Sequence, residues 1–144
     1  EKGLDNLGLF RMVSGGKVYN LTISDSKVKG NKSLGIIAGV ATNATFKNLK
    51  IKKSDIRTSS GNTQDLGGVI GSASTGGVIT LDNIALDFVS IDANGFDTKN
   101  LGGVVGRSEV GLTFINTYFR GEIDAVGINT QPYPLIQEVD QIST

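Results

Sequence analysis

Short apolar stretches alternate with glycine-, serine- and asparagine-rich stretches along the whole chain, and no apolar stripe with helical spacing is sustained. Strand side chains alternate between two faces, so the two-residue spacing of Leu21 and Ile23 predicts that both point to the same side. The 20 glycines against 2 prolines favour many tight turns between short strands. The pattern therefore predicts an all-β chain.

Four segments of the chain begin alike, with a leucine followed by a glycine. They are Leu7-Gly8-Leu9-Phe10, Leu34-Gly35-Ile36-Ile37, Leu66-Gly67-Gly68-Val69 and Leu101-Gly102-Gly103-Val104. The length differences between the repeats fall in polar stretches, where loops tolerate insertions. One such repeat is too short to bury its own apolar face, so stacked copies are expected to share one core.

A second landmark in each repeat is an asparagine flanked by apolar residues. Aligning Asn20, Asn48, Asn83 and Asn116 gives four columns: Val18/Phe46/Leu81/Phe114, Leu21/Leu49/Ile84/Thr117, Ile23/Ile51/Leu86/Phe119 and Val28/Ile56/Ile91/Ile123. All members are apolar except Thr117. The last column follows the asparagine by eight residues in three repeats and by seven in the fourth. These columns predict the side chains that face the core.

The spacing around the asparagine predicts a bend. Val18 and Leu21 are three residues apart, so a straight strand cannot point both inward, and Asn20 sits between them. Asparagine tolerates the left-handed conformation better than most residues. Stacked asparagines would form a hydrogen-bonded ladder, whereas ordinary turn asparagines would give the same bend without one.

The Leu-Gly segment is expected to be one strand with one buried face. Its always-apolar column is placed inside, and the residue that follows each member is placed outside. The inward set is Phe10/Ile37/Val69/Val104, and the outward set is Arg11/Ala38/Ile70/Val105. The leucines at positions 7, 34, 66 and 101 are then expected to enter the core from a preceding turn.

The expected fold is a right-handed parallel β-helix, or β-solenoid, of about four coils with three short strands per coil. It covers residues 1–127, with repeats at 7–33, 34–65, 66–100 and 101–127. The repeat pattern stops after Gly127, and Pro132 and Pro134 interrupt any strand. Residues 128–144 are therefore expected to be an extended tail or linker.

Composition narrows the function. The 14 basic and 14 acidic residues balance, so neither nucleic acid nor an anionic membrane is an expected partner. Lys47, Lys50, Lys52 and Lys53 are expected to form a solvated face. Without cysteine or histidine there is no disulfide, thiolate site, Ser-His-Asp triad or HExxH motif. No membrane span or signal peptide is seen, and a monomeric fragment of a longer chain is expected.

Several acidic residues are candidates for a metal or catalytic site. Asp82, Asp87, Asp92 and Asp97 recur every five residues, but the loop from Asp92 to Asp97 does not follow the EF-hand pattern. The carboxylates Glu109 and Glu122 are isolated in sequence, unlike the clusters that glycosidases use. We therefore expect no catalytic, cofactor-binding or metal site, no cofactor, and no enzymatic activity in this stretch. Tyr118 and Phe119 are adjacent, so one of them is expected on the surface.

The Leu-Gly-Gly-Val-Ile-Gly and Leu-Gly-Gly-Val-Val-Gly blocks, at residues 66–71 and 101–106, resemble GLUG-type repeats. The resemblance covers residues 7 to about 126, and the first repeat departs from it with Leu9 and Phe10. Such repeats occur in large bacterial surface proteins, including the region upstream of the catalytic domain in IgA1-specific zinc metallopeptidases. The resemblance implies an extracellular or cell-surface location and neighbouring domains in a longer parent chain.

Three functions remain open from the sequence. The first is a structural spacer and presentation module of a secreted or surface-anchored bacterial protein. The second is an adhesin-type module that binds a glycan or a host protein through its outer face. The third is an accessory domain that positions substrate for a surface metallopeptidase.

Overall fold

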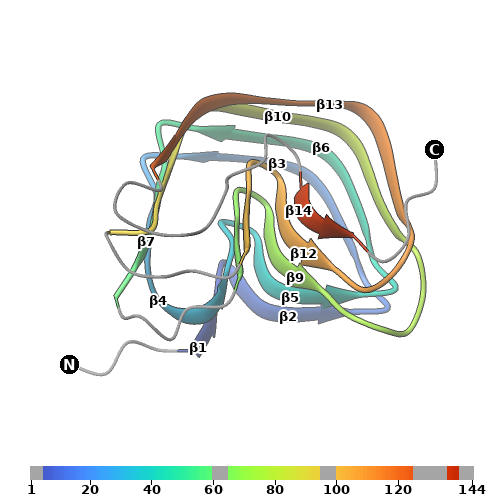
Figure 1. The fold of residues 1–144 in the computed structure, drawn as a ribbon. Helices are drawn as coiled ribbons and strands as arrows, with labels where there is room; N and C mark the ends of the chain where they lie inside the picture. The colour runs from blue at the N-terminus through green and yellow to red at the C-terminus, as the bar shows by residue number, and fades with distance from the viewer. Residues whose placement is uncertain (1–4, 60–64, 95–99, 125–135, 140–144) are drawn as a thin grey trace.

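The computed structural model describes residues 5–59, 65–94 and 100–124, and the backbone of residues 136–139. Within these ranges the chain forms strands, bends and turns, and every strand pair is parallel. In Figure 1 the chain winds counter-clockwise as it advances towards the viewer from blue to orange, so the solenoid is right-handed. The expected parallel β-helix is confirmed.

The strands follow the four repeats. The first coil contains β1 (Asp5–Leu7), β2 (Phe10–Ser14), β3 (Lys17–Ser24) and the start of β4 (Lys27–Leu34). The second contains the end of β4, β5 (Ala38–Thr42), β6 (Thr45–Lys52) and β7 (Asp55–Thr58). The third contains β8 (Asp65–Gly67), β9 (Ile70–Ala73) and β10 (Ile79–Asp92), and the fourth β11 (Asn100–Gly102), β12 (Val105–Ser108) and β13 (Leu112–Asp124). The last two coils thus have three strands each, but one of the three is a long strand, β10 or β13, that spans both the asparagine and the last apolar column. In the first two coils this long strand is broken at a corner.

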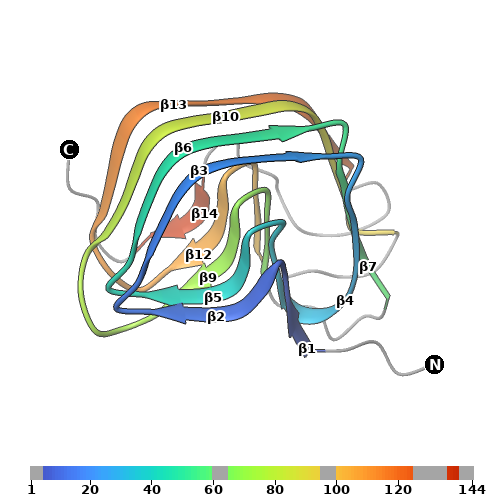
Figure 2. The same cartoon turned by 180° about the vertical axis from the view of Figure 1, so that it is seen from behind.

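Equivalent strands of successive coils pair to form two sheets. A 9-stranded sheet has the order β11-β8-β4-β7-β10-β6-β3, with β1 paired to β4 and β13 paired to β10. A 5-stranded sheet has the order β14-β12-β9-β5-β2. Figure 2, seen from behind, shows the first coil as the near end of this stack.

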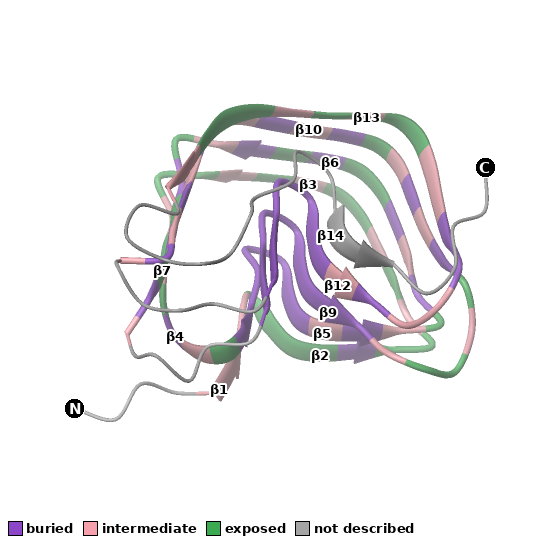
Figure 3. Cartoon of the chain, viewed as in Figure 1, coloured by how far each residue is buried: buried purple, intermediate pink, exposed green. Residues whose placement is uncertain are grey.

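The apolar columns predicted from the sequence match the register in which the strands pair. Phe46 of β6 pairs with Val18 of β3 and Leu81 of β10, and Leu81 pairs with Phe114 of β13. The columns through Leu49, Ile51 and Ile56 stack in the same way. Core residues of the two middle coils are almost completely shielded from solvent, and Figure 3 shows them in purple. The described residues make about three turns of the solenoid, slightly fewer than the four coils expected.

Part of the expected tail belongs to the solenoid. Ile136–Val139 forms β14, which pairs in parallel with β12 and adds a strand to the smaller sheet. The predicted end of the repeat at Gly127, and the remainder of residues 128–144, lie outside the described residues.

The Leu-Gly segment differs from the expected single strand. It forms two short strands joined by a turn, such as β8 and β9, and Figure 1 shows this turn projecting into the coil towards β10 and β13. Residues expected outside, Ala38, Ile70 and Val105, are fully buried, whereas Phe10, expected inside, is 42% exposed. The outward placement of that column was wrong because an inward-folded pair of strands is covered on both faces. The other placements hold: Ile37, Val69 and Val104 are fully buried, and Arg11 is exposed.

Glycine makes this inward fold sterically feasible. A Cβ on Gly71 would lie 2.5 Å from the backbone nitrogen of Leu34, and one on Gly68 would lie 2.3 Å from a methyl carbon of Leu86. Real Cβ atoms do not approach other atoms so closely, so these positions admit only glycine without movement. The glycines of the Leu-Gly blocks therefore allow the backbones of neighbouring coils, and the side chain of Leu86 in β10, to pack closely against the inward fold.

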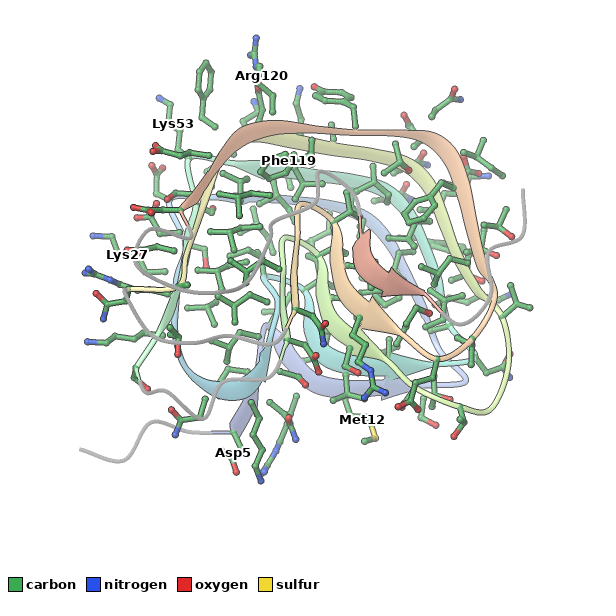
Figure 4. The ribbon with its side chains drawn as sticks, viewed as in Figure 1. Asp5, Met12, Lys27, Lys53, Phe119 and Arg120 are labelled. Atoms are coloured by element: carbon green, nitrogen blue, oxygen red, sulfur yellow. The ribbon has the colours of Figure 1, made fainter. Side chains whose placement is uncertain are left out.

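The end coils are less covered than the middle ones. In β3 the core-facing side chains are half-buried, and in β2 Phe10 and Met12 are exposed. Met12 points outward at the edge of the smaller sheet in Figure 4. At the other end, Phe114 and Phe119 of β13 pack against the core but are only partly buried. Both ends therefore present apolar side chains in the register of a further coil.

Candidate functional site

All four asparagines occupy the predicted bend. Their φ angles are 57° at Asn20, 55° at Asn48, 56° at Asn83 and 45° at Asn116, all left-handed. The Nδ2 of Asn48 donates to Oδ1 of Asn20 over 2.9 Å, and Nδ2 of Asn83 donates to Oδ1 of Asn48 over the same distance. The asparagine ladder is therefore present across the first three coils.

We expect Asn48→Gly to lower the free energy of unfolding by about 1–2 kcal/mol, because two ladder hydrogen bonds are lost while glycine still accepts the left-handed conformation. Asn116→Gly is the matched control, since neither of the two ladder hydrogen bonds involves Asn116 and the cost of this change should be clearly smaller. Urea denaturation of the two variants measures the difference. Equal losses would show that the ladder bonds contribute nothing beyond the bend.

The recurring aspartates are partners of basic residues in adjacent coils. Asp82 pairs with Lys47 at 3.2 Å, and Asp92 pairs with Arg57 at 3.0 Å. Asp87 pairs with Arg120 of the next coil. Opposite charges directly across neighbouring strands support the pairing, with small contributions at exposed positions.

The loop that begins at Asp92 is only partly described. One carboxylate oxygen of Asp92 accepts from the backbone N–H of Asn94 at 2.6 Å, and the other pairs with Arg57. Arg57 also donates to the side-chain oxygen of Asn94 at 2.6 Å. Both carboxylate oxygens of Asp92 and the side-chain oxygen of Asn94 are therefore already engaged, by Arg57 or by a backbone N–H, while Asp97 lies outside the described residues.

We expect EDTA to leave the thermal midpoint unchanged, because the carboxylate of Asp92 is neutralised by Arg57 and needs no cation. Thermal melts with EDTA, with added calcium and with neither should superimpose. A fall of several degrees with EDTA that calcium reverses would contradict this assignment.

A buried polar ladder was missed by the sequence reading. Oγ of Ser33 donates to Oδ2 of Asp65 at 3.1 Å, and Nδ2 of Asn100 donates to Oδ1 of Asp65 at 2.7 Å. All three residues are at most 6% exposed. The available signal was the polar residue that precedes each repeat leucine. Leu34, Leu66 and Leu101, which follow Ser33, Asp65 and Asn100, are fully buried, so this ladder links the coils from inside.

The basic residues expected to form a solvated face are on the outside. Lys47, Lys50 and Lys53 are exposed and Lys52 is half-buried, and Lys53 points away from the coil in Figure 4. In the same view Phe119 points inward and Arg120 outward from β13. Tyr118 is 49% exposed, so it is the member of the adjacent aromatic pair that faces solvent.

An exposed phenylalanine, Phe88, occupies a corner within β10, and the sequence did not lead us to expect it. Phe88 is left-handed, with φ 56°, and 60% exposed. The equivalent corner residues of the first two coils are also left-handed but polar, namely Asp25 and Lys53. The Arg120 guanidinium lies 4.5 Å from the centre of the Phe88 ring. Its hydrogen bond to Asp87 lowers the pKa of that carboxyl below the ordinary value and raises the pKa of Arg120.

A hollow opens beside this ring. Its volume is about 390 Å³, and its lining residues are Phe88, Val89, Ser90, Arg120, Gly121 and Glu122. The fourth coil has no counterpart of Phe88, because the register skips one residue between Asp87 and Val89. This missing residue explains why Ile123 follows Asn116 by seven residues, whereas the spacing is eight in the other repeats. A second depression of about 270 Å³ on the same outer face is bordered by Tyr118, Asn48 and Asn83, among others.

Comparisons with protein-family models, curated proteins and solved structures found no match to this chain. The described residues include no group of three or more acidic, histidine or cysteine side chains placed to hold a metal ion. Across the same ranges no helix is long and apolar enough to cross a membrane.

Proposed function

We propose that the chain is a non-catalytic spacer and presentation module of a secreted or surface-anchored bacterial protein. The observation that carries the proposal is the parallel, in-register stack, in which equivalent residues lie one above another. Each coil adds about 4.8 Å along one axis. The number of repeats therefore sets the length of the module, and the GLUG-type resemblance agrees with a surface protein.

Several kinds of contact tie each coil to the next. The asparagine ladder lies on the outer corner, and the ladder through Asp65 lies inside. Ion pairs such as Lys47–Asp82 join coils across the outer face. Since stability in such arrays is a sum over neighbouring interfaces, these links favour a stiff rod.

The partly exposed apolar rows at both ends support a place within a longer assembly of neighbouring domains. Open strand edges of this kind are normally covered, because they otherwise pair with other chains. A binding role is the second candidate, and the hollow beside Phe88 is the observation that favours it.

The spacer proposal is tested by adding a coil. A second copy of residues 34–65 is inserted between Asp65 and Leu66. Because Leu34 and Leu66 are equivalent positions in neighbouring coils, the inserted copy joins the chain in register. The chain has no cysteine, so Tyr19→Cys and Ile115→Cys give unique spin-label sites in one outward column. We expect their separation, measured by dipolar electron paramagnetic resonance, to grow by about 5 Å.

The added coil should also raise the denaturation midpoint, because it adds one more interior interface. Labels at Tyr19 and Ser24, both in β3, are the control, and their separation should not change. An unchanged Tyr19–Ile115 separation, or an inserted coil that stays unfolded, would refute a length-setting role.

A further inference from the structure

The conformation of Phe88 is costly for that residue type. A bulky residue with positive φ is uncommon, because the left-handed region brings the Cβ of an L-residue too close to the backbone. Phe88 also leaves most of its ring in water. Glycine, asparagine or the polar residues of the first two coils would meet the same corner at lower cost. Strain of this kind at an exposed position points to a use for the side chain.

Neighbouring groups hold the ring in place. The Arg120 guanidinium lies over it at 4.5 Å, and Asp87 holds that guanidinium from the adjacent strand. A cation–aromatic contact of this geometry is favourable even at exposed sites. The missing residue in the fourth coil leaves space beside the ring, and Gly121 keeps the corner tight because a Cβ there would lie 1.9 Å from the carbonyl oxygen of Val89.

The hollow combines an apolar surface with both kinds of hydrogen-bonding group. Phe88 supplies the ring, Arg120 supplies N–H donors, and Glu122 supplies an acceptor carboxylate. Its volume lies within the range of about 300–1,000 Å³ typical of small-ligand sites. A few convergent polar groups beside an apolar surface are what such sites use to orient a ligand.

The charges around the hollow favour a neutral ligand. The lining of the hollow contains one cationic and one anionic side chain, Arg120 and Glu122, so the two charges balance. An anion would meet the carboxylate of Glu122, and a cation would meet the guanidinium of Arg120. A hydroxyl-rich neutral molecule with an apolar face meets neither objection.

We propose that the hollow lined by Phe88, Arg120 and Glu122 binds a pyranose residue of a neutral glycan. The apolar face of the sugar stacks on Phe88, and its hydroxyls accept from Arg120 and donate to Glu122. Tyr118 lies two residues before Arg120 on the outer face of β13 and borders the second depression. Adjacent sugars of the same glycan reach that depression, so the preferred ligand is an oligosaccharide. This site goes beyond the spacer function.

The test uses soluble neutral oligosaccharides of glucose, galactose, mannose and N-acetylglucosamine, together with sulfated and sialylated counterparts. Saturation-transfer NMR detects binding, and amide-shift titration of the isotopically labelled chain gives affinity. We expect at least one neutral oligosaccharide to bind, with the largest shifts around Phe88 and Glu122. Binding of charged glycans only, or of none, would overturn the proposal.

Variants locate the site. Phe88→Gly relieves the left-handed strain, so the fold is retained while the stacking surface is removed, and affinity should fall at least tenfold. Glu122→Gln keeps the shape and should weaken binding severalfold. Tyr19→Ala removes another exposed aromatic, in the first coil and before the asparagine bend, and should leave affinity unchanged. Affinity that survives Phe88→Gly would place the glycan elsewhere and reject this site.

Discussion

Replacing Phe46 with alanine is expected to lower the free energy of unfolding by about 3–5 kcal/mol. Phe46 is completely buried and lies in the second of the stacked rows, paired with Val18 below and Leu81 above. Removal of its ring leaves a cavity that neighbouring coils cannot close, because their backbones are hydrogen-bonded in register. Urea denaturation monitored by circular dichroism measures the loss.

The control for this change is Lys50→Ala, on the exposed face of the same strand. Lys50 points to solvent, so its replacement should alter stability by no more than about 0.5 kcal/mol. Ile51→Ala, one residue further along and fully buried, should cost about 2–5 kcal/mol. Similar losses for Lys50 and Ile51 would contradict the facing of β6 and the solenoid register with it.

Gly71→Ala is expected to cost about 3 kcal/mol, a large effect for one added methyl group. The three atoms that its Cβ would meet are all backbone, at 2.5–2.8 Å, and belong to Leu34, Ser33 and Gly39. No side-chain rotation can relieve these contacts. The two strands of the inward fold must separate, and the buried ladder from Ser33 to Asp65 is disturbed with them.

Gly16→Ala is the matched control for this prediction. Its φ is not in the left-handed region, and its Cβ would meet only a side-chain carbon of Val13, at 3.2 Å. That methyl can move, so the change should be close to neutral. Equal denaturation midpoints for the two variants would show that the inward strands do not pack as closely as described.

The repeat columns could be predicted because one physical rule governs them. Along β3 and β6 one face is buried and the other meets solvent, so alternation reports the facing directly. The left-handed asparagine was predictable for a related reason, since three-residue spacing of inward side chains requires a bend. The apolar column through Phe46 and the bend at Asn48 are therefore both visible in the sequence.

The Leu-Gly segment could not be assigned in the same way. Ile37 and Ala38 are consecutive and both fully buried, so alternation carries no information there. What distinguishes the segment is close backbone approach at Gly71, and that depends on residues more than thirty positions away in the chain. Ser33, Asp65 and Asn100 were missed for the same reason, because their hydrogen bonds join separate coils.

The sequence by itself determined the repeat, the core columns and the asparagine bend, because each follows from local spacing and residue type repeated in register. Only the tertiary structure decided which strands fold inward and what borders Phe88. The spacing of seven residues in the fourth repeat is readable from the sequence, but it becomes a hollow only when that coil stacks on the third. The hollow forms because the third coil has a corner residue, Phe88, that the fourth coil lacks, and the two coils are neighbours only in the folded chain.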